Sequence, residues 1–166
     1  MPHSLEEFLS VALLVPMGVE ADPSNPNCIW GLPVVVEGPP GVGKSALVKA
    51  TAAAVELEGR TIYCPTRSYE DFAGLPMPDA DDPDGVRMVC PLPAIRQLKK
   101  AESGVCFLDE ISGTPRAVQN ALLGFVLDRA VGDLQLPPRV RILSAANGIL
   151  EGGNYELIPP LANHFA

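Results

Sequence analysis

The stretch 38–45 combines glycines, a lysine and a serine at a spacing typical of phosphate binding. It reads Gly38, Pro39, Pro40, Gly41, Val42, Gly43, Lys44, Ser45 and fits the pattern G-x-x-x-x-G-K-[S/T]. The glycines let backbone N–H groups turn toward an anion, and the start of a following helix adds positive charge. We expect Lys44 to reach the β- and γ-phosphates of a nucleotide and Ser45 to bind Mg²⁺.

Two carboxylates follow the apolar run 105–108. Asp109 lies 65 positions after Lys44, with one predicted strand between them. We expect Asp109 to hold Mg²⁺, usually through water, and Glu110 to orient and deprotonate an attacking water molecule. An apolar strand that ends in Asp-Glu is weak evidence alone, and its spacing from the phosphate-binding pattern makes it strong.

Asn147 ends the fourth predicted strand, 139–146. Its amide is a candidate contact for the γ-phosphate or for the attacking water. The alternative is a simple turn, because Asn147-Gly148 is a common turn pair. We favour the functional interpretation because convergent strand ends form ligand sites in sheets of this kind.

The elements that must position these residues alternate along the chain. Apolar and β-branched runs predict strands over 33–37, 60–64, 105–108 and 139–146. Helical patterns cover 5–15, 44–58 (with Gly59 as its cap), 92–102 and a segment that begins at Thr114-Pro115. Such alternation predicts a parallel sheet with right-handed crossovers. Residues 38, 109 and 147 then gather at one edge of the sheet.

The stretch 65–91 differs from its surroundings because it is rich in proline and aspartate. We expect mainly a long surface loop, with a short strand at 86–89. Long loops in compact domains are usually functional or mobile, and a solvated acidic loop is the plain alternative.

Composition excludes several classes. The 166 residues carry a net charge of −8, which disfavours nucleic-acid binding by bulk attraction. The longest apolar run, 8–19, is interrupted and shorter than the ~20 residues of a membrane-spanning helix, and no positive charge precedes it as in a signal peptide. The four cysteines are scattered without a C-x-x-C pair, so we expect buried free thiols in the cytoplasm.

Taken together, four segments resemble an AAA+ ATPase of the MoxR-like group. They are 37–45, 107–111, Ala145-Ala146-Asn147 and 159–163. The combination, order and spacing are specific for AAA+, whereas the narrower assignment rests on Gly-Leu-Pro at 31–33 and 74–76 and on the ending 161–165. The likeness covers residues 30–166, an AAA+ nucleotide-binding core, and leaves an N-terminal helix and loop, residues 1–29, before it.

The resemblance implies an α/β P-loop NTPase fold, a three-layer sandwich around a parallel sheet. It also implies ATP and Mg²⁺ as ligands, and hydrolysis of ATP to ADP and phosphate coupled to remodelling of a protein partner. Members usually act as a homo-oligomeric ring, often with a client that carries a von Willebrand A domain. No membrane and no nucleic acid are expected as partners.

The chain departs from the family at two points. The family's Ala-Asn-Arg-Phe ending has an arginine that reaches the neighbouring subunit's ATP, and His164 stands at that position here. The family also continues into a last strand and a helical lid, and this sequence contains neither. We therefore expect a C-terminally truncated core with weak hydrolysis and doubtful ring formation.

Two alternatives remain open. One is a nucleotide-binding interaction module with little or no hydrolysis, because the lid and the trans-acting arginine are missing. The other is a DNA-linked motor, supported only by a few basic residues: Arg96, Lys99, Lys100, Arg139 and Arg141. Short basic clusters are usually solvated surfaces, so we favour a protein partner.

Overall fold

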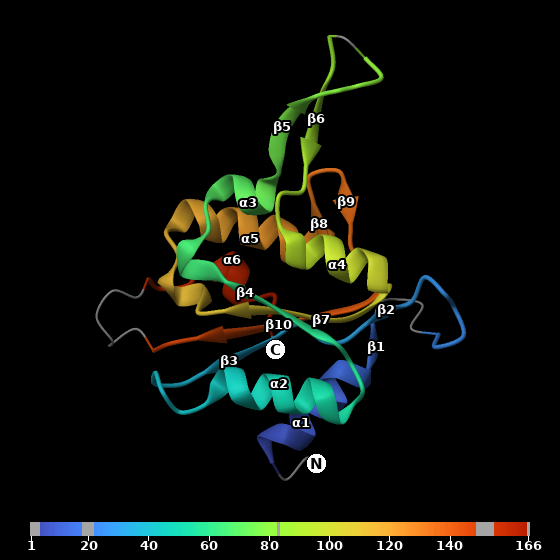
Figure 1. Cartoon of the computed structure of the whole chain (residues 1–166). Helices are drawn as coiled ribbons and strands as arrows, with labels where there is room; N and C mark the ends of the chain where they lie inside the picture. The colour runs from blue at the N-terminus through green and yellow to red at the C-terminus, as the bar shows by residue number, and fades with distance from the viewer. Residues whose placement is uncertain (1–3, 18–21, 83, 149–154, 166) are drawn as a thin grey trace.

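The computed structural model of the chain describes residues 4–17, 22–82, 84–148 and 155–165. Its elements follow one another as shown in Figure 1. They are α1 (Leu5–Leu14), β1 (Pro16–Met17), β2 (Ile29–Trp30), β3 (Val34–Glu37), α2 (Lys44–Ala54), β4 (Gly59–Tyr63), the 3-10 turn η1 (Cys64–Thr66), α3 (Tyr69–Ala73), β5 (Leu75–Pro78), β6 (Val86–Val89), α4 (Pro93–Ala101), β7 (Ser103–Asp109), the 3-10 turn η2 (Ile111–Gly113), α5 (Arg116–Asp128), β8 (Ala130–Val131), β9 (Leu134–Gln135), β10 (Arg139–Ala146) and α6 (Pro159–Ala162).

Four parallel strands form the central sheet in the order β3-β10-β7-β4. The two inner strands, β7 and β10, are buried along nearly their whole length, which explains why most of their residues are apolar. The register pairs Leu108 with Ser144 and Asp109 with Tyr63. The predicted parallel sheet and its four strands are thus confirmed, and β3 lies at an edge.

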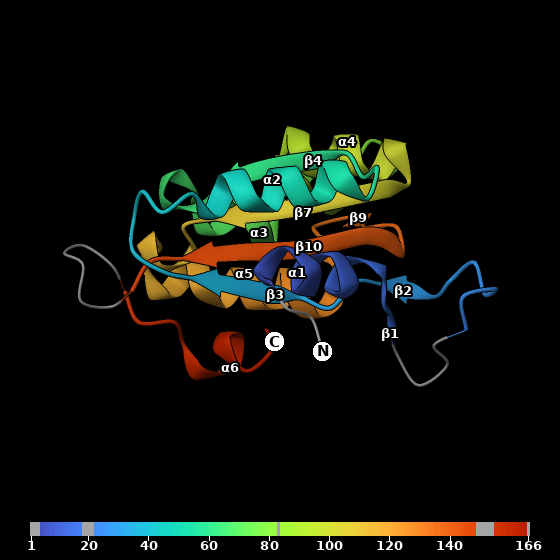
Figure 2. The ribbon, with the colours of Figure 1, turned by 90° about the horizontal axis from the view of Figure 1, so that it is seen from below.

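Helices cover both faces of the sheet, which gives three layers (Figures 1 and 2). On one face α1 and α2 enclose a cluster that includes Phe107 and Val36. On the other face α3, α4 and α5 enclose a larger cluster that includes Leu108 and Phe125, and α6 packs against α5. Alternate residues of β7 therefore enter different clusters, as the period of two in a strand requires.

Arg141 ties the N-terminal segment to the sheet. Its buried side chain donates from Nε to the carbonyl oxygen of Leu13 at 3.0 Å, and its guanidinium lies 5.6 Å from the ring centre of Trp30. Desolvation lowers the pKa of this guanidinium. Because Arg141 is committed to these internal contacts, it is unavailable to a nucleic acid.

Helix α2 ends earlier than expected. It stops at Ala54, and Glu56 takes a left-handed conformation with φ 56° while the N–H of Leu57 donates to the Ala52 carbonyl. This is the hydrogen bond of a Schellman ending. Gly59 is therefore the first residue of β4 and not a helix cap, so that part of the prediction is wrong.

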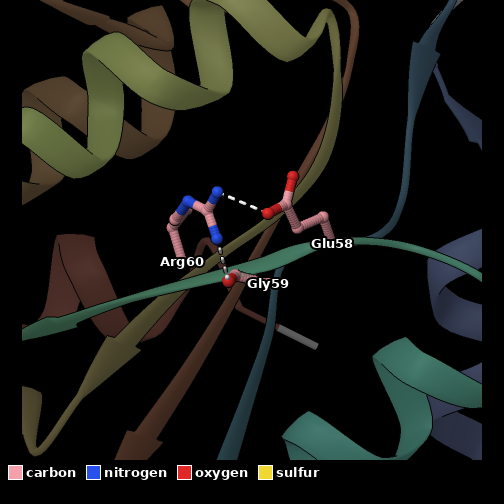
Figure 3. A network of polar contacts seen from close by, with 3 residues as sticks. All are labelled: Glu58, Gly59 and Arg60. Atoms are coloured by element: carbon pink, nitrogen blue, oxygen red, sulfur yellow. Dashed lines mark hydrogen bonds and ion pairs between the residues drawn. The ribbon is translucent and has the colours of Figure 1, made fainter.

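An exposed ion pair flanks the start of β4. The carboxylate of Glu58 accepts a contact from the Arg60 guanidinium, which also donates to the Gly59 carbonyl (Figure 3). Glu58 is exposed and Arg60 is partly exposed, so water screens the pair and its contribution to stability is small. The main chain fixes this end of the strand instead, because the Glu58 carbonyl accepts from the Val105 N–H at 2.9 Å.

The stretch 65–91 is more ordered than the sequence suggests. It contains part of η1, the helix α3 and a hairpin formed by β5 and β6, so the expected long loop is wrong while the short strand at 86–89 is confirmed. A capping box explains α3, since Ser68 caps the helix and its backbone N–H donates to Asp71. The hairpin stands away from the three layers (Figure 1).

The base of this hairpin is anchored on the turn between β8 and β9. The carbonyl of Met88 accepts from the N–H of Asp133, and Gly132 approaches the same carbonyl with φ 57°. A Cβ at Gly132 would lie far inside van der Waals contact with the Met88 oxygen. The close approach of these two hairpins therefore requires glycine.

We predict that Gly132→Ala destabilises the protein by about 1–3 kcal/mol or more, because the new methyl group meets backbone atoms that have no room to move. The matched control is Gly124→Ala, at a helical position of α5 with open space around it, which should gain up to about 1 kcal/mol. Chemical denaturation of both variants measures the difference. Equal stabilities would contradict the tight contact at Gly132.

Candidate functional site

The loop 38–43 joins the end of β3 to the start of α2. Gly41 and Gly43 have φ of 80° and 92°, and the space where their side chains would be is open. Left-handed conformations at these two positions are what a turn around an anion needs. With Lys44, Ser45, Asp109, Glu110 and Asn147, this loop lines a cavity of about 220 Å³.

The side chain of Lys44 lines this cavity. Its ammonium donates to the carbonyl oxygens of Gly38 and Pro39, at 2.7 and 2.9 Å, and to Oδ1 of Asn147 at 2.7 Å. All three acceptors are neutral, so these contacts leave the positive charge uncompensated. A cation held in this way at the start of a helix suits an anionic ligand such as a phosphate.

Ser45 and Asp109 meet at the lining of the same cavity. The Ser45 hydroxyl donates to Oδ2 of Asp109 at 2.8 Å, although the two residues lie 64 positions apart. A hydroxyl and a carboxylate are oxygen donors of the kind Mg²⁺ prefers, and the remaining ligands would come from water and phosphate. The residues present therefore fit a magnesium ion bound together with a nucleotide.

Glu110 has a left-handed backbone, with φ 56° and ψ 48°, which turns the chain sharply after β7. Its Oε2 accepts a hydrogen bond from the Tyr63 hydroxyl at 2.9 Å. The hydrogen bond to Glu110, together with the repulsion that its carboxylate exerts on a phenolate, raises the pKa of Tyr63. Tyr63 therefore holds the carboxylate that is predicted to activate water.

The hydroxyl of Ser112 fixes the backbone of Asn147. The Asn147 N–H donates to Oγ of Ser112 at 2.9 Å, and the Ser112 carbonyl accepts from the Tyr155 N–H at 2.7 Å. Ser112 is buried and lies two residues after Glu110. The amide that contacts Lys44 and the carboxylate that contacts Tyr63 are thus positioned by the same short turn, η2.

Buried Gln119 completes this framework. Its amide nitrogen donates to the Thr114 carbonyl at 3.0 Å, and its amide oxygen accepts from the Ile158 N–H at 2.8 Å. Thr114 itself donates to the Ile111 carbonyl at 2.6 Å. These contacts fix the segment before α6 against the turn η2.

All the sequence-predicted residues from 38 to 45, with Asp109, Glu110 and Asn147, thus lie around one cavity or in the loop that forms it. Tyr63 and Ser112 were missed. Tyr63 had a signal, because it is among the last residues of a predicted strand and so belongs at the same edge of the sheet. No sequence pattern indicated the role of Ser112, because its hydrogen bond with the Asn147 N–H depends on the fold of η2.

His164 lies elsewhere. It follows α6, is exposed, and lines a separate cavity of about 270 Å³ with Met17, Ile29 and Arg129 among its other walls. The structure does not bring it to the cavity of the phosphate-binding loop within this chain. Its expected position at a neighbouring subunit's nucleotide stays a prediction.

The four cysteines take no part in this site. All are buried free thiols, as predicted, and desolvation raises the pKa of Cys106 to about 12. In the part of the chain that the structure describes, no group of three His, Cys, Asp or Glu residues is arranged to hold a metal ion. A second, larger cavity of about 690 Å³ lies between α1 and α2, away from the strand ends.

Comparisons with known proteins agree with this fold. A family model described as an AAA domain of the dynein-related subfamily matches residues 33–153. A crystal structure of a candidate ATPase from Cytophaga hutchinsonii shares the fold, with a TM-score of 0.53 and 22% identity over 80% of this chain. This chain spans 39% of that protein's length. None of the curated proteins compared with the chain shows a significant match.

Within the described residues, every helix is too short or too polar to span a lipid bilayer.

We predict that Glu110→Gln lowers the pKa of the Tyr63 phenol, because the variant removes the carboxylate that accepts its hydrogen bond and repels its ionised form. NMR titration of a protein labelled at the tyrosine ring carbon measures this. The control Glu58→Gln, which changes an exposed carboxylate in the ion pair with Arg60, should leave the Tyr63 titration as it is. An unchanged midpoint in Glu110→Gln would show that the contact does not persist in solution.

Proposed function

The chain belongs to the AAA domain family, in its dynein-related subfamily, and on this premise we propose that it is an ATP-binding and ATP-hydrolysing module of a MoxR-like, chaperone-type ATPase. The observation that carries the proposal is the Lys44 ammonium, which lies beside the Ser45–Asp109 pair with only neutral oxygens as hydrogen-bond acceptors. A cation beside oxygen ligands for Mg²⁺ suits a nucleoside triphosphate.

In this proposal the loop 38–43 and Lys44 bind the phosphates of ATP. Ser45 and Asp109 would hold Mg²⁺, which would supply positive charge beside the phosphate oxygens. Glu110 orients a water molecule and accepts its proton while the water oxygen attacks the γ-phosphorus and ADP leaves. The Lys44 ammonium donates to Asn147 as well as to the loop carbonyls. In this proposal Asn147 contacts the γ-phosphate or the attacking water.

The proposed role of hydrolysis is to remodel a protein partner in the cytoplasm, with a ring of subunits expected for intact members of the family and doubtful for this chain. A client with a von Willebrand A domain is one candidate. Turnover by this chain alone should be weak. Arginine in trans stabilises the charge of the transition state and accounts for ~10³–10⁵ in rate where it acts, whereas the imidazole of His164 is shorter and lacks the planar fork of donors.

A nucleotide-binding interaction module with little hydrolysis is the second candidate. It is favoured by His164, which stands where the family has arginine and lines a cavity apart from the phosphate-binding loop. Turnover measured at increasing protein concentration separates the two functions. A rate per subunit that stays at background at every concentration, in the presence of tight ATP binding, would favour the second.

We predict that Lys44→Ala weakens ATP binding at least about tenfold, because it removes a charge-assisted contact to phosphate. Lys49→Ala, which removes an exposed lysine from the same helix, is the matched control and should bind ATP normally. Fluorescent ATP analogues measure the affinity. Normal binding by Lys44→Ala would contradict the proposed phosphate site.

We predict that Glu110→Gln keeps ATP affinity within about twofold of the original protein and lowers phosphate release by ~10²–10⁴, because an amide does not accept the proton of water. Phosphate release under saturating ATP and Mg²⁺ measures the rate. His164→Ala should change the rate little. The assignment of roles fails if Glu110→Gln loses binding as severely as Lys44→Ala does.

A further inference from the structure

The hairpin of β5 and β6 exposes apolar side chains along its whole length. The exposed fractions are 41% for Leu75, 48% for Met77, 68% for Val86 and 41% for Met88. Water contact with so many large apolar groups in one short ribbon is unfavourable, and grouped exposure of this kind marks interaction surfaces. The hairpin also projects away from the sheet and its helices (Figure 1).

The strand register separates the two faces of the ribbon. Pro76 pairs with Met88 and Pro78 pairs with Val86, so these four side chains share one face, which we call the apolar hairpin face. The opposite face carries Leu75, Met77 and Val89 but is interrupted by the charge of Arg87. Only the apolar hairpin face is free of charge along its length.

The edges of the ribbon are poorly suited to binding another strand. Pro76 and Pro78 have no N–H to donate from β5, a device that protects exposed strand edges. On β6 the Met88 carbonyl already accepts from the N–H of Asp133. A partner would therefore contact the side chains of the apolar hairpin face, without extending the sheet.

The anchored base keeps this face extended from the protein. Gly74 and Gly132 pack closely together, and the Cys90 N–H donates to Oδ1 of Asp133 at 3.4 Å. These contacts prevent the hairpin from folding back to bury its own apolar residues. The surface is thus presented ready for a partner, with little ordering cost to binding.

The acidic residues at the tip of the hairpin indicate the charge of the partner. Three exposed aspartates lie there, at positions 81, 82 and 84, next to the half-buried Asp79. Oδ1 of Asp82 accepts from the Asp84 N–H at 3.2 Å and Oδ1 of Asp79 accepts from the Asp81 N–H at 3.0 Å, so these acceptors shape the turn. The cluster disfavours a second copy of this acidic chain and favours a partner with lysine or arginine.

We propose that the apolar hairpin face and the acidic tip together bind a segment of the protein partner in which apolar side chains lie next to lysine or arginine. This inference extends the remodelling role proposed above, because it identifies the surface that engages the partner and the chemistry of the segment engaged. It does not depend on the nucleotide site for the contact itself.

The test uses three short fluorescent peptides and the full chain. One peptide alternates leucine and valine with lysine, a second replaces lysine with glutamate, and a third replaces leucine and valine with serine. Fluorescence anisotropy should show binding of the first peptide at least about tenfold tighter than of either other peptide, since both the apolar and the charged contacts are needed. Equal affinities for the three peptides would overturn the proposal.

Variants of the hairpin locate the contact. Val86→Thr with Met88→Gln keeps the side-chain size and should weaken binding of the first peptide about fivefold or more. Met77→Gln, a similar change on the opposite face, is the matched control and should bind normally. Binding that survives the double variant, or that Met77→Gln weakens equally, overturns the assignment to this face.

Charge is tested separately by Asp81→Asn with Asp82→Asn. The amide oxygen introduced at position 82 can still accept from the Asp84 N–H, so the turn is kept and only charge is lost. Affinity for the lysine peptide should fall about threefold and lose most of its dependence on salt. Unchanged affinity and salt dependence would exclude the acidic tip from the contact and overturn that part of the proposal.

The nucleotide site supplies the control for the proposed function. Lys44→Ala should bind the lysine peptide normally, and the hairpin variants should bind ATP normally. Failure of the ATP predictions with intact peptide binding would overturn the ATPase proposal alone. Absence of peptide binding with intact ATP binding would overturn the hairpin proposal alone, and peptide-driven dimerisation in sedimentation would show that a second copy is the true occupant.

Discussion

The shared direction of β3, β10, β7 and β4 is the constraint on which the site depends. In a parallel sheet every strand delivers its last residue to the same edge, so segments far apart in the sequence come together without any long-range contact being specified separately. The loop after β3, the carboxylates after β7 and the amide after β10 meet for this reason. An antiparallel arrangement of the same strands would separate Ser45 from Asp109 by the length of the sheet.

Burial on both faces explains why this part of the fold is predictable from sequence. Burial favours mainly apolar residues in the inner strands, and their patterns at 105–108 and 139–146 are visible without an alignment. The phosphate-binding loop is equally visible, because its glycines are required by backbone geometry. The family assignment and the three-layer fold followed from these same segments, and both are confirmed.

Elements stabilised by a few specific contacts were less predictable. The end of α2 depends on a left-handed Glu56, a residue type that gives no sign of such a conformation. The hairpin of β5 and β6 depends on a close approach to Gly132, which lies more than forty residues further along the chain than the hairpin's own tip. The contact of Tyr63 with Glu110 depends on register, since a shift of one residue would turn the tyrosine to the other face.

The hydrogen bonds of Lys44 have a consequence for any ligand that reaches it. An ammonium group has three N–H donors, and in this structure they go to Gly38, Pro39 and Asn147. A phosphate oxygen that takes one of these donors must displace a protein oxygen, so binding is an exchange of partners. If Asn147 is the partner displaced, its amide oxygen becomes free at the moment the ligand arrives. Occupancy of the loop is then communicated to the end of β10 by a single hydrogen bond.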